Sequence, residues 1–393
     1  MKNLKDLNVK GKRVLCRVDF NVSADKATGA IKDDTRVVAA LPTIQYLAGQ
    51  GARVILCSHY GRPKDRDAKL SLKPVAECLA KHLKKSVAFA GDCIGAPAEN
   101  AVAALKDGEI LLLENLRYHG GEESDDAEFA AQLAKLADVY VDDAFGAAHR
   151  AHASVHAVAA RFTEKAPGFL LQKEVEYLGK ALLKPDHPYV VVLGGAKVSD
   201  KIKVIGKMLE VADTVLIGGA MAYTFLLAQG KPVGKSLTEP DFVSMARDIV
   251  KKAAELKKQF ILPLDHVVAE KIAPGVASKT VAWDQIPDGQ LALDIGPKTI
   301  ERYSAELSKA RMIVWNGPLG VFECEPFNTG TFAIAHAIAS NANAISIVGG
   351  GESVAAVNKA KVADKITHIS TGGGASLEFL EGKTLPGVQA LSQ

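Results

Sequence analysis

The chain has 393 residues, which is long for one hydrophobic core and predicts two domains. Apolar residues make up 48% and charged residues 24%, as in a globular protein, and the net charge of +3 argues against a general nucleic-acid or membrane binder. Five cysteines without a CxxC pair exclude a disulfide framework. The sequence shows no signal peptide, lipidation motif or membrane-spanning apolar stretch, so we expect a cytoplasmic protein.

Short apolar runs alternate with helical patterns in the first half of the chain. The expected strands are Val14–Val18, Val54–Cys57, Val87–Ala90, Ile110–Leu113 and Val139–Val141. The helical patterns include Arg36–Ala48, Leu72–Lys84 and Glu128–Leu136. Strands that alternate with helices predict a parallel sheet with helices on both faces.

Polar residues follow four of these strands. These segments are Asp19–Asn21, Ser58–Arg62, Glu114–Arg117 and Asp142–His152. In open α/β sheets ligands bind beyond the carboxyl ends of the strands, so we expect the four segments to share one edge. Nine of the twelve arginines precede residue 162, and the guanidinium fork suits carboxylate or phosphate. The first half is therefore predicted to hold an anion site.

The second half repeats the alternation around glycine loops. Its expected strands are Tyr189–Leu193, Thr214–Ile217, Phe260–Leu262, Met312–Trp315, Ala344–Val348 and Ile366–Ser370. After the first strand come two glycines and then Lys197 and Lys201, four residues apart. A helix that opened there would present both ammonium groups on one face, as in a phosphate site. A plain turn with solvated lysines is the alternative.

Two further glycine loops precede predicted helix starts. Gly349–Gly351 lead into Glu352 and Ser353, and Gly372–Gly374 lead into Ser376. Free N–H groups and the helix dipole favour an anion at such a start, although close packing of helix on sheet also explains one loop. Three glycine loops in one half favour nucleotide phosphate.

Other patterns in the sequence raise further kinds of site. The glycines in Gly230–Ser236 are too close for a Walker motif, and no GxGxxG follows the first strand of either half. His149, His152 and His156 would share a face of a helix, near Asp142 and Asp143, which raises a zinc or iron site. Their interleaving with Arg150 favours an anion-binding edge instead. No catalytic triad is present, which suits phosphoryl transfer between groups that are already anionic.

Eight motifs together closely resemble the phosphoglycerate kinase family along nearly the whole chain. They are RVDFN (17–21), SHYGRP (58–63), ENLR (114–117), AFGAAHRAH (144–152), GGAKVSDK (194–201), WNGPLGVFE (315–323), GGGES (349–353) and STGGGASLEFLEGKTLPGV (370–388). The resemblance implies a phosphotransferase with a carboxyl group as acceptor. Its glycolytic reaction converts 1,3-bisphosphoglycerate and ADP reversibly to 3-phosphoglycerate and ATP.

The resemblance also implies the site residues. The phosphoglycerate ligands would be Asp19, Asn21, Arg36, His59, Arg62, Arg117 and Arg150. The catalytic groups would be Arg36, Lys197, Lys201 and the backbone N–H groups of Gly372 and Gly373. The nucleotide ligands would be Gly195, Lys201, Gly218, Gly219, Asn316, Glu323, Gly350, Gly351, Glu352 and Ser353. Glu352 would also serve the Mg²⁺ that accompanies ADP or ATP.

The implied architecture is α/β, with two Rossmann-like, doubly wound parallel-sheet domains joined by a helix. Residues 1–167 would bind phosphoglycerate, 168–185 would form the interdomain helix, 186–375 would bind nucleotide, and 376–393 would return to the first domain. The family resemblance further implies a monomer that binds small molecules, without a nucleic-acid or membrane partner. Ser23, Ala147, Ala220 and Glu352 depart from the residues that the family usually carries, namely proline, threonine, glycine and aspartate.

Two other classes of protein remain as alternatives. A dinucleotide-dependent oxidoreductase would share the doubly wound halves but requires the missing glycine fingerprint. A non-catalytic anion-binding protein would explain the arginines, but not Lys197 and Lys201 facing glycine loops.

Overall fold

The computed structural model describes residues 1–25 and 30–392, and it divides into two compact units. Unit 1 comprises Met1–Glu176 with Thr384–Gln393, and unit 2 comprises Tyr177–Lys383. The boundary falls inside one helix, α5 (Phe169–Leu183). Within the described residues, no helix is both long and apolar enough to cross a membrane.

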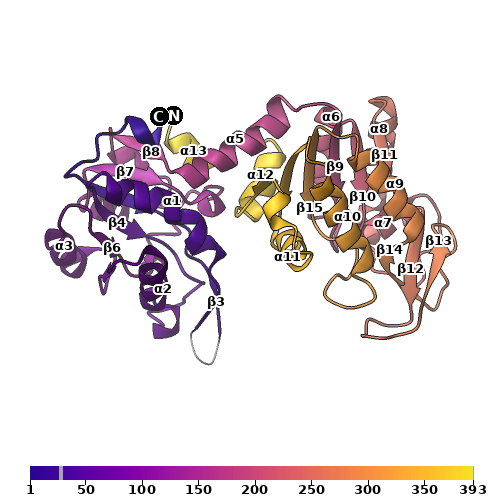
Figure 1. Ribbon diagram of the computed structural model, residues 1–393, viewed down its shortest axis with the longest axis horizontal. Coiled ribbons are helices and arrows are strands. Elements are labelled where there is room, and N and C mark those ends of the chain that lie inside the picture. Colours follow the sequence, from indigo (N-terminus) through magenta and orange to yellow (C-terminus); the bar gives the residue numbers. More distant parts are fainter. Residues whose placement is uncertain (26–29, 393) are drawn as a thin grey trace. The chain divides into compact units, whose positions relative to one another are not determined.

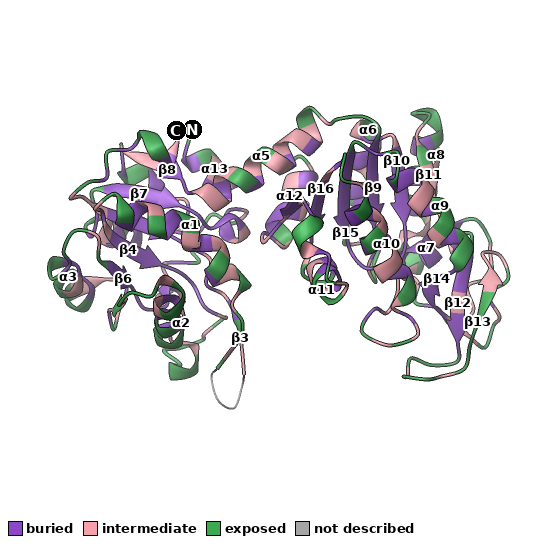
Figure 2. Ribbon diagram, viewed as in Figure 1, coloured by how far each residue is buried: buried purple, intermediate pink, exposed green. Residues whose placement is uncertain are grey.

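A parallel sheet forms the centre of unit 1, in the order β5-β6-β4-β1-β7-β8. Its strands are β1 (Arg13–Arg17), β4 (Arg53–Cys57), β5 (Ala88–Phe89), β6 (Ile110–Leu112), β7 (Val139–Asp142) and β8 (Lys165–Pro167). Strands β1, β4 and β7 are buried on both faces, which is why they read as continuous apolar runs (Figure 2). A short hairpin, β2 (Ser23–Ala24) and β3 (Ile31–Asp33), precedes the first helix.

Helices cover the sheet of unit 1. They are α1 (Thr35–Gly49), α2 (Lys73–Leu83), α3 (Gly95–Ala103), α4 (Ala127–Ala134) and, from the end of the chain, α13 (Pro386–Ala390). Helices α1 and α2 pack against each other and share one core with β1 and β4 (Figure 1). The backbone N–H of Gly387 bonds to the carbonyl of Ala148, which fixes the start of α13 to unit 1.

Unit 2 is built on a second parallel sheet, in the order β11-β10-β9-β15-β16-β17. Its strands are β9 (Tyr189–Leu193), β10 (Thr214–Ile217), β11 (Gln259–Ile261), β15 (Met312–Asn316), β16 (Ile345–Gly349) and β17 (His368–Ile369). Its helices are α6 (Ile202–Val211), α7 (Met221–Ala228), α8 (Val243–Glu255), α9 (Pro297–Leu307), α10 (Thr329–Ser340), α11 (Gly351–Lys359) and α12 (Gly374–Leu380).

The helices of unit 2 form two groups. Helix α6 packs on α8 and α12, whereas α10 packs on α9 and α11 (Figure 1). The second group shares a core with Val190, Val192 and Trp315, which point to the same face because side chains alternate along a strand. The predicted class, two Rossmann-like parallel-sheet domains, is confirmed by these sheets.

Several elements differ from the sequence prediction. Strand β8 and helix α3 were not predicted, and neither was an antiparallel sheet of β12 (Asp265–Ala269), β13 (Ser278–Ala282) and β14 (Leu291–Ile295). Helix α6 begins at Ile202, so the prediction of a helix carrying both Lys197 and Lys201 is wrong. The residues before Ile202 form turns, closed by a bond from the Lys201 N–H to the Val198 carbonyl.

Candidate functional site

The carboxyl ends of β6, β4, β1 and β7 lie next to one another in unit 1. Because these strands are parallel, the four polar segments that follow them meet at one edge of the sheet, as predicted. We call this edge the arginine edge, defined by Asp19, Asn21, Arg36, His59, Arg117 and Arg150.

An ion pair orients Arg36 at the arginine edge. Its Nη1 donates to Oδ2 of Asp19 at 2.8 Å, and the rest of its guanidinium has no partner among the described residues. Burial alone would raise the pKa of the Asp19 carboxyl, but His59, Arg36, Arg17 and the Asn21 N–H lower it below its usual value. Asp19 is therefore a carboxylate at neutral pH, and Arg36 presents its free N–H groups to a ligand.

A second, fully buried arginine fixes His59. Arg17 donates from Nη2 to Nδ1 of His59 at 3.0 Å and from Nε to the Ser154 hydroxyl at 3.0 Å. A guanidinium can only donate, so Nδ1 of His59 is an acceptor and the ring proton sits on Nε2. Burial, together with the positive charge of Arg17 and Arg117, lowers the pKa of His59 to about 3. His59 therefore serves as a neutral hydrogen-bond donor.

The loop after β4 connects the remaining groups. The Gly61 N–H donates to Oδ1 of Asn21 at 2.9 Å, and the Gly61 carbonyl accepts from Nη1 of Arg117 at 2.7 Å. Arg117 and Arg150 are close enough for their charges to repel. Arg62 and Arg150 are exposed, and neither side chain bonds to any residue in the described ranges. Arg62 follows Gly61 in this loop, but no contact draws it toward the other arginines.

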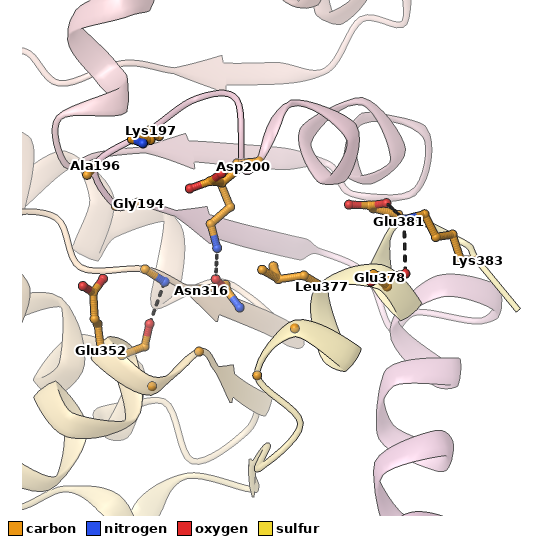
Figure 3. A pocket seen from close by; sticks show the side chains of 18 residues that line it. Gly194, Ala196, Lys197, Asp200, Asn316, Glu352, Leu377, Glu378, Glu381 and Lys383 are labelled. Atoms are coloured by element: carbon orange, nitrogen blue, oxygen red, sulfur yellow. Dashed lines mark hydrogen bonds and ion pairs between the residues drawn. The ribbon is translucent and has the colours of Figure 1, made fainter. Parts of the chain in front are cut away.

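A polar cavity of about 670 Å³ opens at the carboxyl edge of the unit 2 sheet. Its walls come from the loop after β9, the end of β15 and the starts of α11 and α12 (Figure 3). The predicted residues that line it are Gly195, Lys197, Lys201, Asn316, Gly350, Gly351, Glu352, Ser353 and Gly373. Two helix N-termini open into this space, so their unpaired N–H groups and dipoles favour an anion. Gly372 does not line the cavity.

Lys201 and Asn316 form the centre of the polar cavity. The buried Lys201 ammonium donates to Oδ1 of Asn316, and Nδ2 of Asn316 is buried without a partner among the described residues. Burial lowers the pKa of Lys201 to about 8, and the charges of Asp200 and Glu352 oppose that shift. Lys197, by contrast, is exposed. An anion here would pair with a desolvated cation and an amide N–H that otherwise lacks an acceptor.

A second, mainly apolar cavity of about 290 Å³ adjoins the first and shares Gly195, Ala196 and Glu352 with it. Its apolar walls include Tyr223, Leu237, Ile272, Leu291, Leu293 and Val321. Of the predicted nucleotide ligands, Gly219 and the exposed Glu323 line this cavity, whereas Gly218 does not. Ala220 also lines it, where the family resemblance suggested a glycine.

Four glycines around the two cavities of unit 2 fall into two groups. A Cβ on Gly194 would lie 2.1 Å from the Pro318 carbonyl oxygen, and one on Gly218 would lie 2.3 Å from Leu319. These two glycines allow loops to pack together. Gly195 and Gly351 have open space where a Cβ would be, so they leave room on the cavity side.

Oxygen ligands for a cation are present in the polar cavity. Four carboxylates line it, and Glu378 and Glu381 form ion pairs with Lys383. Asp200 and Glu352 are exposed and form no ion pair among the described residues. These two carboxylates suit Mg²⁺, which prefers oxygen ligands and is usually held by one or two carboxylates together with a bound phosphate.

Of the three histidines in the alternative zinc or iron site, His149 and His156 lie in turns and His152 in irregular backbone, and none lies in a helix. His156 bonds to Asp125 at 2.7 Å, and Nδ1 of His152 lies 4.0 Å from Glu122. In the described part of the chain they do not gather as metal ligands.

Sequence reasoning missed several residues of these sites. Arg17 was not proposed as a site residue, although a charge inside an apolar strand run is itself a signal. Asp200 and Leu377 line the polar cavity, and Tyr223 lines the apolar one. Asp200 and Leu377 lie within two of the family motifs but received no role from them, and Tyr223 lies in none of the motifs. Their positions depend on chain segments that meet only in the fold.

Parallel α/β units with a cationic, glycine-lined cavity are the arrangement that nucleotide-binding phosphotransferases use, among other anion-binding proteins. Residues 4–383 match the family described as phosphoglycerate kinase. The chain therefore belongs to the phosphoglycerate kinase family.

Individual relatives agree with this assignment. The chain is 56% identical to phosphoglycerate kinase of Moorella thermoacetica over 391 residues, covering 99% of this chain and 98% of that protein. It is 54% identical to the enzyme of Pelotomaculum thermopropionicum with the same coverage. The structure of phosphoglycerate kinase from Coxiella burnetii matches with a TM-score of 0.91 at 41% identity, covering 100% of this chain and 99% of the other. The predictions of family, activity and enzyme class are confirmed.

Proposed function

We propose that the arginine edge of unit 1 binds 3-phosphoglycerate or 1,3-bisphosphoglycerate. The proposal is supported by the ion pair of Arg36 with Asp19, by Arg117 near a neutral His59, and by Arg150 near Arg117. Arginines suit this ligand because they fork onto both carboxylate and phosphate. In this proposal Arg36 reaches the carboxyl end, where transfer occurs, and Asn21, Arg62 and the other arginines hold the rest of the molecule.

We further propose that unit 2 binds ADP or ATP across its two adjoining cavities. The apolar cavity suits the adenine ring, with Gly219 beside it and Glu323 on the ribose. The polar cavity suits the phosphates, which would accept from Asn316, Lys201 and the N–H groups at the starts of α11 and α12. Gly218 would act indirectly, since its lack of a Cβ allows Leu319 to pack beneath the loop.

Transfer then requires positioning and charge neutralisation rather than a general base. The acceptor oxygen already belongs to a carboxylate or phosphate, so no proton has to be removed. Lys201 is mostly protonated at neutral pH and would neutralise charge on the transferred group, together with Lys197 and the N–H of Gly373. The N–H of Gly372 would contribute in the same way. Mg²⁺, held by Glu352 with Asp200 nearby, would supply further positive charge to the nucleotide phosphates.

The combination of a buried lysine, an unpaired amide and two helix starts in one cavity carries this proposal. The test is a coupled assay of ATP formed from ADP and enzymatically generated 1,3-bisphosphoglycerate, with and without Mg²⁺. Turnover that needs both substrates and Mg²⁺ supports it. If either ligand binds but no ATP forms, the proposed phosphoryl transfer is wrong and the chain only binds these ligands.

We also propose that the enzyme works as a cytoplasmic monomer whose domains, 1–167 and 186–375, close on the two substrates about the helix at 168–185. The segment 376–393 would couple the two, and the placement of α13 in unit 1 supports that return. Transfer needs donor and acceptor nearly in contact and water excluded. Small-angle scattering should give the smallest radius of gyration with both substrates bound. An unchanged radius across the apo, single-ligand and ternary states would contradict closure.

A further inference from the structure

A mixed group of side chains lies between α1 and α2 in unit 1, apart from the substrate-binding residues. Cys78 and His82 are one turn apart on α2, so they lie on one face of that helix. The same helix buries Val75 and Leu79 in the core. Helices α1 and α2 pack together (Figure 1). Asp34 occupies the position just before α1, and its carboxylate contacts His82 on α2.

The donor atoms of these three residues converge. Nε2 of His82 lies 2.7 Å from Oδ2 of Asp34, and one ligand atom from each of Asp34, Cys78 and His82 lies within 4.8 Å of the other two. The Asp34 carboxylate forms no capping bond to its own helix. The imidazole is 33% and the carboxylate 48% exposed, and the Cys78 side chain is half-buried, so an ion could reach all three from solvent.

We propose that Asp34, Cys78 and His82 bind a thiophilic divalent cation such as Zn²⁺. Thiolate, imidazole and carboxylate are the ligands that zinc prefers, and water would complete a tetrahedron. Mg²⁺ is excluded because it requires oxygen ligands. On binding, the thiol proton leaves to solvent and the His82 ring proton moves from Nε2 to Nδ1, so that two bonds to the metal replace the hydrogen bond between His82 and Asp34.

A second group, Asp92, Cys93 and His119, has the same composition but is less suitable. Oδ2 of Asp92 is already held by Nη1 of Arg66 at 3.0 Å, and the Cys93 side chain is fully buried. Only Oδ1 of Asp92, which faces His119, is left for an ion, and the ion would have to enter the core to reach the Cys93 thiol. This group therefore provides a matched comparison within the same unit.

Metal at the proposed site would tie the start of α1 to α2. Asp34 is two residues before Arg36, so this metal-mediated link would lie next to a residue of the arginine edge. Because the metal binds only where both helices are folded together, we expect Zn²⁺ to raise the unfolding temperature of the protein.

The experiment uses the full chain without a polyhistidine tag. Competition with a chromogenic chelator gives the dissociation constant for Zn²⁺, and the absorption of bound Co²⁺ reports a thiolate ligand. We expect Cys78→Ser and His82→Gln to weaken Zn²⁺ binding by about a hundredfold or more and to abolish the rise in unfolding temperature. Cys324→Ser and His119→Gln should behave as the unaltered protein, and Mg²⁺ should not compete.

Asp34→Asn provides an independent variant in case a change on α2 disturbs folding, and it should weaken Zn²⁺ binding without removing the Co²⁺–thiolate absorption. The proposal is overturned if Co²⁺–thiolate absorption persists in Cys78→Ser. It is equally overturned if His119→Gln removes the binding, or if the unaltered protein binds no Zn²⁺.

Discussion

The two sites hold positive charge in different ways. At the arginine edge, carboxylates fix the guanidinium groups from neighbouring loops, as Asp19 does for Arg36 and Glu123 does for Arg117. In the polar cavity of unit 2, glycine-rich loops and helix starts supply backbone N–H groups around one buried ammonium, that of Lys201. The first site therefore depends on the direction of its donors, and the second on loop packing and a desolvated charge.

The largest effect should come from the buried charge. Lys201→Met keeps most of the length of the side chain but removes the ammonium beside Asn316. We expect kcat to fall about a hundred- to a thousandfold, the usual cost of removing a group that stabilises developing charge. Lys197→Met should lower kcat by a smaller factor, because Lys197 is exposed and water can replace part of the charge stabilisation that its ammonium supplies. Steady-state kinetics of both variants measure the difference, and equal losses would contradict this ranking.

The same lysine predicts a pH dependence. Burial lowers the pKa of Lys201 to about 8, so the ammonium is present below that pH and is lost as the pH rises through it. We expect kcat/KM for the nucleotide to fall on the alkaline side of about pH 8, since this parameter reports groups of the free enzyme. Lys201→Arg stays charged and should remove that falling limb, whatever its absolute rate. If kcat/KM of Lys201→Arg still falls above about pH 8, another group is responsible for the pH dependence.

Loop packing should give the next largest effect. Gly194→Ala would place a Cβ 2.1 Å from the Pro318 carbonyl oxygen, so the loops after β9 and β15 must separate. We expect unit 2 to lose about 1–3 kcal/mol of stability, as in other overpacked sites, and nucleotide binding to weaken with it. Both tryptophans, Trp283 and Trp315, lie in unit 2, so their fluorescence during denaturant unfolding reports this unit.

Gly351→Ala is the control for this change, because no atom lies within 4 Å of its added Cβ. It should leave the unfolding midpoint nearly unchanged. Equal destabilisation by both substitutions would show that backbone freedom, rather than packing, determines the effect.

The comparison also separates what the sequence can predict from what it cannot. The continuous strands and the loops that follow them were predictable, because apolar runs and the parallel topology together place Asp19, His59 and Arg117 at one edge. The start of α6 was not, since the Ser199 hydroxyl and N–H both bond to Glu239, forty residues away. The apolar cavity collects Tyr223, Ile272 and Val321 from separate segments, and each reads alone as an ordinary core residue.

Donor direction at the arginine edge is tested by Arg36→Lys, which keeps the charge. A lysine can pair with Asp19 or with the ligand, but it cannot present a planar fork to both. We expect activity to fall about ten- to a hundredfold, as when charged hydrogen bonds are lost. Arg53→Lys is the matched control, since Arg53 begins β4 at the opposite edge and bonds Asp107 at 3.0 Å. Wild-type turnover of Arg36→Lys at saturating substrates would remove Arg36 from the transfer site.

The smallest effect should come from Glu352, whose carboxylate is exposed and shares the polar cavity with Asp200. Glu352→Gln keeps the shape of the side chain but removes the charge that favours a cation. We expect Mg²⁺-nucleotide to bind about tenfold more weakly, while phosphoglycerate affinity stays the same because its proposed site lies in unit 1. Glu378→Gln is the control, because Glu378 lines the same cavity but pairs with Lys383. Titration calorimetry measures the affinity of each variant for Mg²⁺-nucleotide and, separately, for phosphoglycerate. If both ligands bind equally more weakly, or if nucleotide affinity does not change, Glu352 is not the metal ligand. Asp200 would then be the candidate, because among the described residues it is the other carboxylate of the cavity that forms no ion pair.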